Sequence, residues 1–269
     1  MEAPAQTAAV AECPTAKPTL VEFYQTLFES VPADTPELQR AAHRLRYQVY
    51  CVEHHYEDPS ANPGGLERDE YDDHAVHGIL RHRPSGMIVG TVRVVLHAPG
   101  ARVGSLPIHR VCQDERMRDP TLLPIARTAE LSRFAVSKSF RRRVGDGVYG
   151  RAEDAEATRH DPRRMIPHIT LGLMSVALRM MVERSIETTC AVMEPALLRM
   201  LARLGIHFNV LGPPVLYHGW RQPCYVKLVQ LLARMKSERP DIWEVITDRG
   251  RFVPRIERGA RVPLEGAAV

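Results

Sequence analysis

Several features that define whole classes of protein are missing from this sequence. No apolar run in the 269 residues approaches the roughly 18 residues that a membrane-spanning helix needs, and no internal repeat is present. Residues 1–17 carry neither the basic segment nor the apolar stretch of a secretory signal peptide. We therefore expect a soluble, cytoplasmic protein with no integral membrane span.

Cysteines are few and follow no metal-binding or disulfide spacing. None of the five belongs to a CxxC pair, which fits reduced thiols in a cytoplasm; they are Cys13, Cys51, Cys112, Cys190 and Cys224. His74 and His77 would lie on opposite faces of a strand, so we interpret them as ordinary histidines. We expect no metal site.

Aromatic residues and net charge are both low. Aromatics make up 6% of the chain, and 36 Lys and Arg against 32 Asp and Glu leave a net charge of +4. A nucleic-acid binder needs a stronger positive field or aromatics interleaved with its basic residues, so we expect no nucleic-acid partner. A mildly basic surface is compatible with an acidic protein partner.

Hydrophobic periodicity predicts a mixed sheet with helices on both faces, an α/β architecture. The expected helices are 20–31, one that starts at Thr35-Pro36, one that starts at Pro167, 195–204 and 240–247. The expected strands are a hairpin at 74–82 and 87–96, then 128–136, 189–193, 210–216 and 224–229. We expect one domain over 19–250 with a mobile basic loop at 138–166, a disordered tail at 1–18 and a loose tail at 251–269.

The strand at 128–136 carries a carboxylate and a hydroxyl among apolar residues. Alternation places Glu130 and Ser132 on one face, roughly 6.5–7 Å apart along the strand, together with Phe134 and Val136. A carboxylate in such a strand is costly unless it is paired or used in chemistry. An ion pair that locks the strand and a catalytic role both stay open.

Other charged residues also occupy positions where a core is expected. With Glu130 they form a balanced set of three acids and three bases, which can be buried if its members pair: Arg46, Asp69, Asp72, Arg93, Glu130 and Arg133. We interpret the five others as a charged network around the active site, although a purely structural network fits equally well.

The order of these residues resembles that in acyl-homoserine-lactone synthases. Those enzymes carry Arg-x3-Phe-x5-Trp on the first helix, then Asp-x2-Asp, then an Arg in the second strand, then Glu-x-Ser-Arg. Here the elements are Arg46-x3-Tyr50-x5-Tyr56, Asp69-x2-Asp72, Arg93 and Glu130-x-Ser132-Arg133. Tyr50 and Tyr56 thus stand where the lactone synthases have the Phe and Trp that line their methionine-derived substrate.

A related group is a closer match. The sequence resembles acyltransferases associated with PEP-CTERM/exosortase systems, which are similar to N-acyl amino acid synthases, and the resemblance covers roughly residues 20–250. It is carried by Leu45-Arg-Tyr-Gln-Val-Tyr-Cys-Val-Glu53, Gly65-Leu-Glu-Arg-Asp-Glu-Tyr-Asp72, Ser132-Arg-Phe-Ala-Val-Ser137, Met193-Glu-Pro-Ala-Leu-Leu198 and Tyr217-His-Gly-Trp-Arg-Gln-Pro223.

These resemblances imply a GNAT-type acyltransferase fold that takes its acyl group from acyl carrier protein. The expected reaction moves a fatty acyl group from the phosphopantetheine thioester to a small amine or amino acid, with no tightly bound cofactor. We expect Glu130 to be the general base with Glu53 in reserve, Ser132 to place the thioester, and Tyr50 and Tyr56 to line the acceptor pocket. A lactone synthase that uses S-adenosylmethionine, and a non-catalytic acyl- or partner-binding module, are the alternatives.

Basic residues after the 128–136 strand are candidates for holding the donor. An acyl carrier protein is acidic and its arm carries a phosphate, so arginines and lysines suit both. A solvated charged run fits as well. The candidates are Lys138, Arg141, Arg142, Arg143, Arg163 and Arg164.

Overall fold

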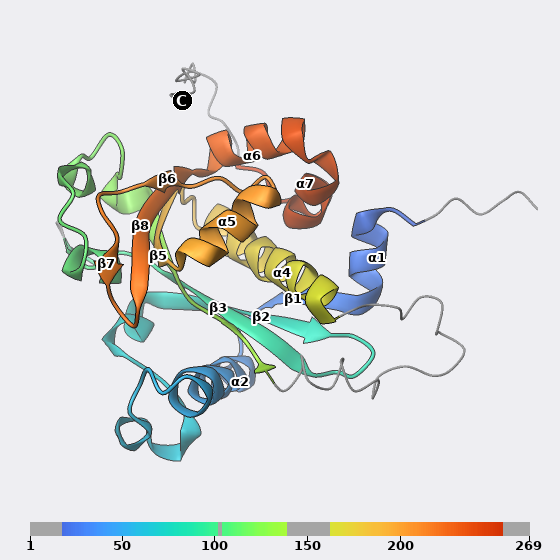
Figure 1. The fold of residues 1–269 in the computed structure, drawn as a ribbon, viewed down its shortest axis with the longest axis horizontal. Coiled ribbons are helices and arrows are strands. Elements are labelled where there is room, and N and C mark those ends of the chain that lie inside the picture. Colours follow the sequence, from blue (N-terminus) through green and yellow to red (C-terminus); the bar gives the residue numbers. More distant parts are fainter. Residues whose placement is uncertain (1–17, 102–103, 139–161, 255–269) are drawn as a thin grey trace, which may run out of the picture.

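A single eight-stranded sheet organises the protein (Figure 1). The computed structural model describes residues 18–101, 104–138 and 162–254. The strands are β1 (Phe28–Pro32), β2 (Ala75–His82), β3 (Ile88–Val95), β4 (Thr128–Val136), β5 (Thr188–Met193), β6 (Asn209–Val210), β7 (Val215–Leu216) and β8 (Trp220–Lys227). Their order is β1-β2-β3-β4-β5-β8-β6, with β7 paired to β8.

Every strand pair is antiparallel except β4 with β5, which run parallel. A parallel pair needs a crossover connection, and α4 (Pro162–Glu183) lies within that connection. The predicted hairpin is confirmed as β2 and β3, and the predicted strand at 128–136 is confirmed as β4. The mixed α/β class is confirmed as well.

Helices cover both faces of the sheet. In Figure 1, α4 crosses one face with α1 (Leu20–Leu27), α5 (Pro195–Arg203), α6 (Leu228–Glu238) and α7 (Pro240–Thr247) on the same side, and α2 (Pro36–Tyr47) lies on the other. The main core fills the space between the sheet and α4, where Val92, Leu131 and Val176 are buried. The predicted start of α2 at Thr35-Pro36 is confirmed, since the Thr35 side chain accepts the Leu38 N–H and Pro36 begins the helix.

Two glycines let α4 approach the sheet closely. A Cβ on Gly78 of β2 would lie 2.7 Å from Val176 Cγ1, and one on Gly172 of α4 would lie 2.5 Å from Leu80 Cδ1. Real side chains do not tolerate such contacts, so helix and strand touch here because neither glycine carries a side chain.

The first predicted helix is too long. Residues 28–32 form the edge strand β1, whose backbone pairs with β2 from Phe28 opposite His82 to Pro32 opposite Gly78. Because Leu27, Phe28 and Val31 also fit a helical stripe, periodicity over so short a run cannot separate the two structures.

Three further boundaries are wrong. Helix α4 begins at Pro162, so Pro167 lies inside it, where its missing N–H removes one backbone hydrogen bond without ending the helix. The strand expected at 224–229 ends at Lys227, and the helix α6 that follows was missed although its apolar residues recur at helical spacing. The strand expected at 210–216 is two short strands, β6 and β7.

The predicted tails, 1–18 and 251–269, and the predicted mobile loop, 138–166, fall mostly outside the described residues. Among the helices in the described part of the chain, none is long and apolar enough to cross a membrane.

Candidate active site

A bulge in β4 shapes the centre of the sheet. Arg93 of β3 opposes Ser132 and Thr91 opposes Ala135, so two residues of β4 face the single residue between them. Arg133 takes up the extra length with a φ of 48°, in the left-handed region that arginine rarely adopts.

Because of the bulge, part of the prediction of which β4 side chains share a face is wrong. Glu130 and Ser132 share a face as expected, because they oppose Val95 and Arg93 of one face of β3. Phe134 and Val136 were expected beside them, but the extra residue reverses the alternation, and both pack on the α4 side with Leu131.

Beyond Glu130 the strands β4 and β5 separate. Their pairing covers only Thr128 to Glu130 against Thr188 to Cys190, although β4 continues to Val136 and β5 to Met193. A cavity of about 490 Å³ lies at this divergence and is lined by both strands. Beyond Glu130, the β5-facing edge of β4 has no strand partner among the described residues, so backbone groups there can meet a ligand.

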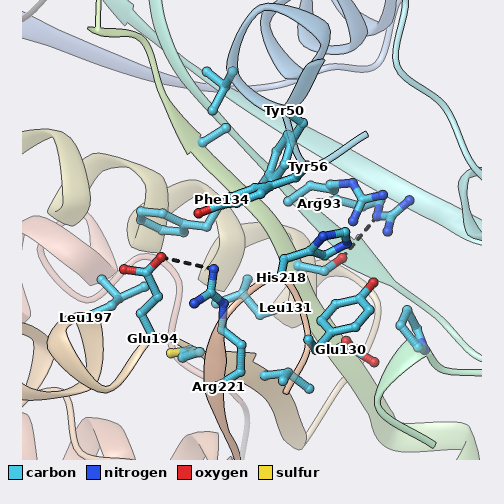
Figure 2. A pocket seen from close by; sticks show the side chains of 18 of the residues that line it. Tyr50, Tyr56, Arg93, Glu130, Leu131, Phe134, Glu194, Leu197, His218 and Arg221 are labelled. Carbon is cyan, nitrogen blue, oxygen red and sulfur yellow. Dashed lines mark hydrogen bonds and ion pairs between the residues drawn. The ribbon is translucent and has the colours of Figure 1, made fainter. Parts of the chain in front are cut away.

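The cavity is apolar at one end and polar at the other. Leu131, Phe134, Met174, Leu197 and Met200, from β4, α4 and α5, make up the apolar part. In the close-up, Phe134 and Leu197 lie at one side and Glu130, Arg93 and His218 at the other (Figure 2). A ligand that fits both ends has an apolar chain and a polar head.

Glu130 is the buried acid of the polar end. The residue is 2% exposed, and its Oε2 accepts the Ile108 N–H at 2.6 Å. Burial raises the pKa of Glu130 to about 8, although the Ile108 amide and the charge of Arg93 act against that rise. A carboxyl group that titrates near neutral pH is suited to accepting a proton from an ammonium group.

Ser132 lies on the same face of β4, and its hydroxyl oxygen already accepts a hydrogen bond. The Arg93 Nε–H donates to Ser132 Oγ at 3.0 Å. The hydroxyl proton of Ser132 is therefore directed elsewhere, and Ser132 lines the cavity.

Three arginines and four carboxylates form a connected network beside Glu130. Arg46 binds Asp72 through two nitrogens, at 2.6 and 3.0 Å, and also contacts Glu67. Arg93 Nη1 lies 2.5 Å from Asp69 and 3.0 Å from Asp72. Arg133 Nη2 lies 2.9 to 3.0 Å from carboxylate oxygens of three residues, which are Glu57, Glu67 and Asp69.

The charges of this network compensate one another in a buried setting. Arg46 and Arg93 are at most 1% exposed. Burial acts to raise the pKa of Asp72, but its bonds to Arg46 and the charge of Arg93 outweigh burial and hold that pKa well below the usual range. The network ties the 57–74 segment to β3 and β4, so it positions the wall that holds Ser132.

Two acids of the network, Glu57 and Glu67, were not predicted from the sequence. Glu67 is 1% exposed and bridges Arg46 to Arg133. It stands within the quoted segment Gly65–Asp72, so the resemblance covered its position without indicating its partners.

Aromatic rings form a further part of the cavity wall. A π-helical segment, Gln48–Glu53, continues α2 and supplies Tyr50, over whose ring the Arg133 guanidinium lies at 5.1 Å. The Tyr56 ring centroid lies 6.4 Å from that of Tyr50 and 5.3 Å from that of His218. Both predicted acceptor-pocket residues, Tyr50 and Tyr56, line the cavity.

A further cation in the cavity was not predicted. Arg221, in β8, has a side chain that is 14% exposed, and its Nη2 lies 3.1 Å from Glu194 Oε1 (Figure 2). The only sequence signal is the quoted segment Tyr217–Pro223, in which Arg221 was given no role.

A family match covers the strands and loops that carry most of these residues. Residues 45–148, which span Arg46 to Arg133, match a family model described as an acetyltransferase (GNAT) domain. This segment is similar to a GNAT domain. No curated protein sequence matches the chain.

Solved structures share the fold of this chain over most of its length. The structure of TofI in a ternary complex with an inhibitor and MTA is 22% identical, covers 78% of this chain and 96% of its own, and has a TM-score of 0.54. The AHL synthase LasI is 17% identical, covers 86% and 98%, and has a TM-score of 0.51. FeeM, an N-acyl amino acid synthase from uncultured soil microbes, is 14% identical, covers 77% and 94%, and has a TM-score of 0.47. At these identities the likeness to TofI and LasI shows the fold alone.

Of the remaining predicted residues, Glu53 and Lys138 are described and lie outside the cavity lining. Glu53 does not line the cavity, and its carboxylate accepts the Lys138 N–H at 3.3 Å, while Lys138 Nζ donates to the Glu53 carbonyl at 3.2 Å. Arg163 and Arg164 belong to the first turn of α4, and their side chains are outside the described part. The predicted donor-binding arginines at 141–143 are also outside the described residues.

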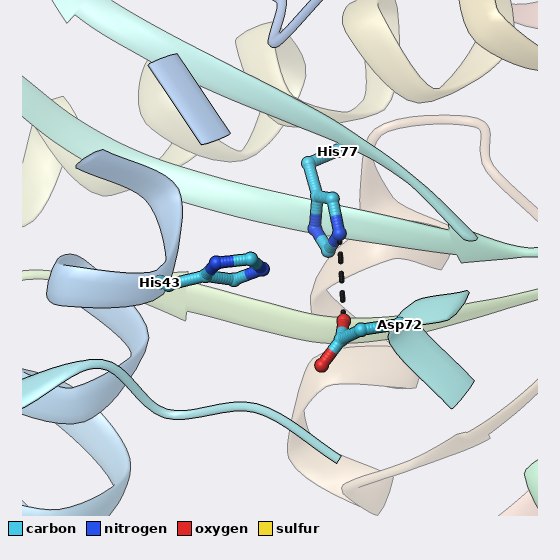
Figure 3. Close-up of side chains that lie close together, drawn as sticks. All are labelled: His43, Asp72 and His77. Carbon is cyan, nitrogen blue, oxygen red and sulfur yellow. Dashed lines mark ion pairs between the residues drawn. The ribbon is translucent and has the colours of Figure 1, made fainter. Parts of the chain in front are cut away.

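One group of side chains has the spacing of a metal site. His43, Asp72 and His77 each offer a ligand atom, and these atoms all lie within 4.8 Å of one another (Figure 3). Burial lowers the pKa of His43 to about 4 and that of His77 to about 3, so both rings are neutral at pH 7. Asp72 Oδ1 already lies 2.6 Å from Arg46 and 3.0 Å from Arg93, whose positive charges oppose a cation there, so we assign the group to the ion network.

Proposed function

We propose that this acyltransferase moves a fatty acyl group from an acyl-carrier-protein thioester to the amine of a small amino acid, giving an N-acyl amino acid. The observation that carries the proposal is the divided cavity between β4 and β5, which has an apolar end and a buried acid, Glu130, at its polar end. An acyl chain suits the first part and a charged amine the second.

Glu130 acts as the general base in the proposed reaction. In its ionised form it takes a proton from the acceptor ammonium, and the free amine then attacks the thioester carbonyl carbon. The tetrahedral intermediate collapses with cleavage of the C–S bond, and the departing sulfur takes the second proton from nitrogen. The products are an amide, a thiol and protonated Glu130, which returns its proton to water.

Hydrogen-bond donors at the divergence of the strands serve the oxyanion. The Ser132 hydroxyl keeps a proton to donate because its oxygen accepts from Arg93. Backbone amides on the unpaired edge of β4 beyond Glu130 are a second source. Arg93 positions Ser132 and does not itself touch the reacting atoms in this scheme.

The donor enters on a long flexible arm, which the gap between β4 and β5 accommodates. Acyl carrier protein as the partner follows from the family resemblance and from the basic residues of the 138–166 segment. An acyl-carrier-protein donor implies a cytoplasmic enzyme with no tightly bound cofactor. Association with a PEP-CTERM/exosortase system belongs to the proposal on the same grounds.

Glu53 has a structural role in this proposal, which therefore takes Glu130 as the base. The Glu53 carboxylate holds the end of β4 through Lys138 and does not line the cavity.

A second candidate function is acyl-homoserine-lactone synthesis from S-adenosylmethionine. Tyr50, Tyr56 and His218 give the polar end an aromatic wall, on which an adenine ring or a sulfonium ion can lie. A non-catalytic acyl- or partner-binding module is a third candidate, but such a module needs no base at the polar end of the cavity.

Purified protein incubated with an acyl donor and an acceptor tests the proposal. We expect thiol release that depends on added amino acid, faster with acyl carrier protein than with the same acyl group on coenzyme A. Release that depends on S-adenosylmethionine and gives a homoserine lactone would favour the second function. Binding of acyl carrier protein without thiol release, for any acceptor, would favour the binding module.

A further inference from the structure

An amino-acid acceptor brings a carboxylate into the cavity, and this carboxylate needs a cation. Arg46, Arg93 and Arg133 are the first candidates for this role, because they belong to the charged network beside Glu130. In the structure Arg46 does not line the cavity and is 0% exposed. Arg93 contacts two carboxylates and Arg133 contacts three, so another anion beside them would add charge to a network in which acids already outnumber bases.

Arg221 differs from those arginines in its partner. Within the described part of the chain it pairs with one carboxylate, that of Glu194, whose side chain is 53% exposed. A pair with one solvated member is weak, because water competes for the carboxylate. Glu194 precedes α5 at the N-cap position, but its side chain makes no capping hydrogen bond, so no described helix bond is lost when it turns into solvent.

The place of Arg221 in the cavity suits an α-amino acid. It lies between the apolar end near Leu197 and the polar end with Glu130 (Figure 2). An α-amino acid carries its ammonium and carboxylate on one carbon, so the base and the cation must reach into the same space. Glu130 and Arg221 both line this cavity, and they come from β4 and β8, on either side of β5.

We propose that Arg221 binds the carboxylate of the acceptor and that the acceptor displaces Glu194 when it does so. This inference rests on the proposed function and names the determinant of its acceptor class. Binding of the acceptor carboxylate by Arg221 makes the enzyme selective for amines that carry a neighbouring carboxylate.

The two partners of the pair should then have opposite effects on acceptor binding. Arg221→Gln removes the cation, so we expect the KM for an amino acid to rise about tenfold or more, with kcat changed less. Glu194→Gln removes the competitor, so we expect that KM to fall. A purely structural ion pair predicts the same direction for both, because either substitution breaks the same contact.

The experiment compares an amino acid with its carboxamide, using purified parent, Arg221→Gln and Glu194→Gln and a fixed acyl-carrier-protein donor. Arg234→Gln is the matched control, because Arg234 is an exposed arginine paired with one glutamate on α6, outside the cavity. We expect the parent and the control to prefer the amino acid by kcat/KM, and Arg221→Gln to lose most of that preference.

Three results would overturn the inference. An unchanged amino-acid preference in Arg221→Gln would mean that another group holds the carboxylate. A raised KM for acyl carrier protein, with the acceptor KM unchanged, would assign Arg221 to the donor phosphate. Failure of the parent to acylate either acceptor would remove the proposed function itself, whereas the first two results would leave that function in place.

Discussion

Replacing Glu130 with Gln should change how the stability of the protein depends on pH. Burial raises the pKa of Glu130 to about 8 from 4.5, so the folded protein holds a proton on this group that the unfolded chain has released between those values. The stabilisation due to this proton is complete below pH 4.5 and is lost as the pH rises toward 8. Each pH unit in that window costs about 1.4 kcal/mol, with a total of at most about 5 kcal/mol.

Gln keeps the size of the side chain and does not titrate, so it isolates this effect. Urea unfolding of parent and Glu130→Gln at pH 5, 6, 7 and 8 gives the difference in unfolding free energy at each pH, and titration of the histidines cancels between them. We expect the parent to lose stability relative to the variant with each step upward. Parallel pH curves would show that Glu130 keeps its ordinary pKa and is solvated.

The same substitution should affect catalysis in the same pH range. A base must be ionised, so kcat/KM of the parent should rise with pH and level off above about pH 8. Glu130→Gln should fold and lose roughly 10²–10⁴-fold in rate. A fully active variant would assign proton removal to another group or to water.

Three further changes test the network, the carrier surface and the packing of α4. Arg93→Ala leaves Asp69 and Asp72 with one fewer buried partner and should cost about 3–5 kcal/mol in thermal or chemical unfolding. A variant that melts like the parent would mean that Arg93 is solvated. Reversing the three arginines at 141–143 to Glu should slow carrier-protein association, with a strong salt dependence in surface-binding kinetics. Unchanged association at low salt would place the docking surface elsewhere. Gly78→Ala puts a methyl group 2.7 Å from Val176 and should cost about 1–3 kcal/mol in urea unfolding, and an unaffected midpoint would show that α4 shifts freely.

Much of the fold was readable because its signals are local. The β2–β3 hairpin and β4 follow from runs of apolar residues bounded by Pro and Gly, and the start of α2 follows from Thr35-Pro36. The helix α6 was readable in the same way and was missed. The edge strand β1 could not be predicted in this way, because the spacing of its apolar residues fits a helix equally well.

Some residues of the candidate site could also be predicted from local sequence signals, and others could not. Residues that stand out as charges in apolar strands, such as Glu130 and Arg93, could be selected from the sequence, and the structure places both at one cavity. The bulge at Arg133 could not be predicted from the sequence, because it depends on the register between β3 and β4. Arg221 and Glu194 come from β8 and the start of α5, and nothing in their local sequence indicates that they meet.

Identification of the product tests the central claim most directly. The protein is expressed in a bacterium alongside Glu130→Gln, and extracted lipids are compared by mass spectrometry. We predict N-acyl amino acids in cells with the parent protein and their loss in cells with the variant. The absence of any new acylated amine, with soluble parent protein present and an acyl-carrier-protein donor supplied, would contradict the account.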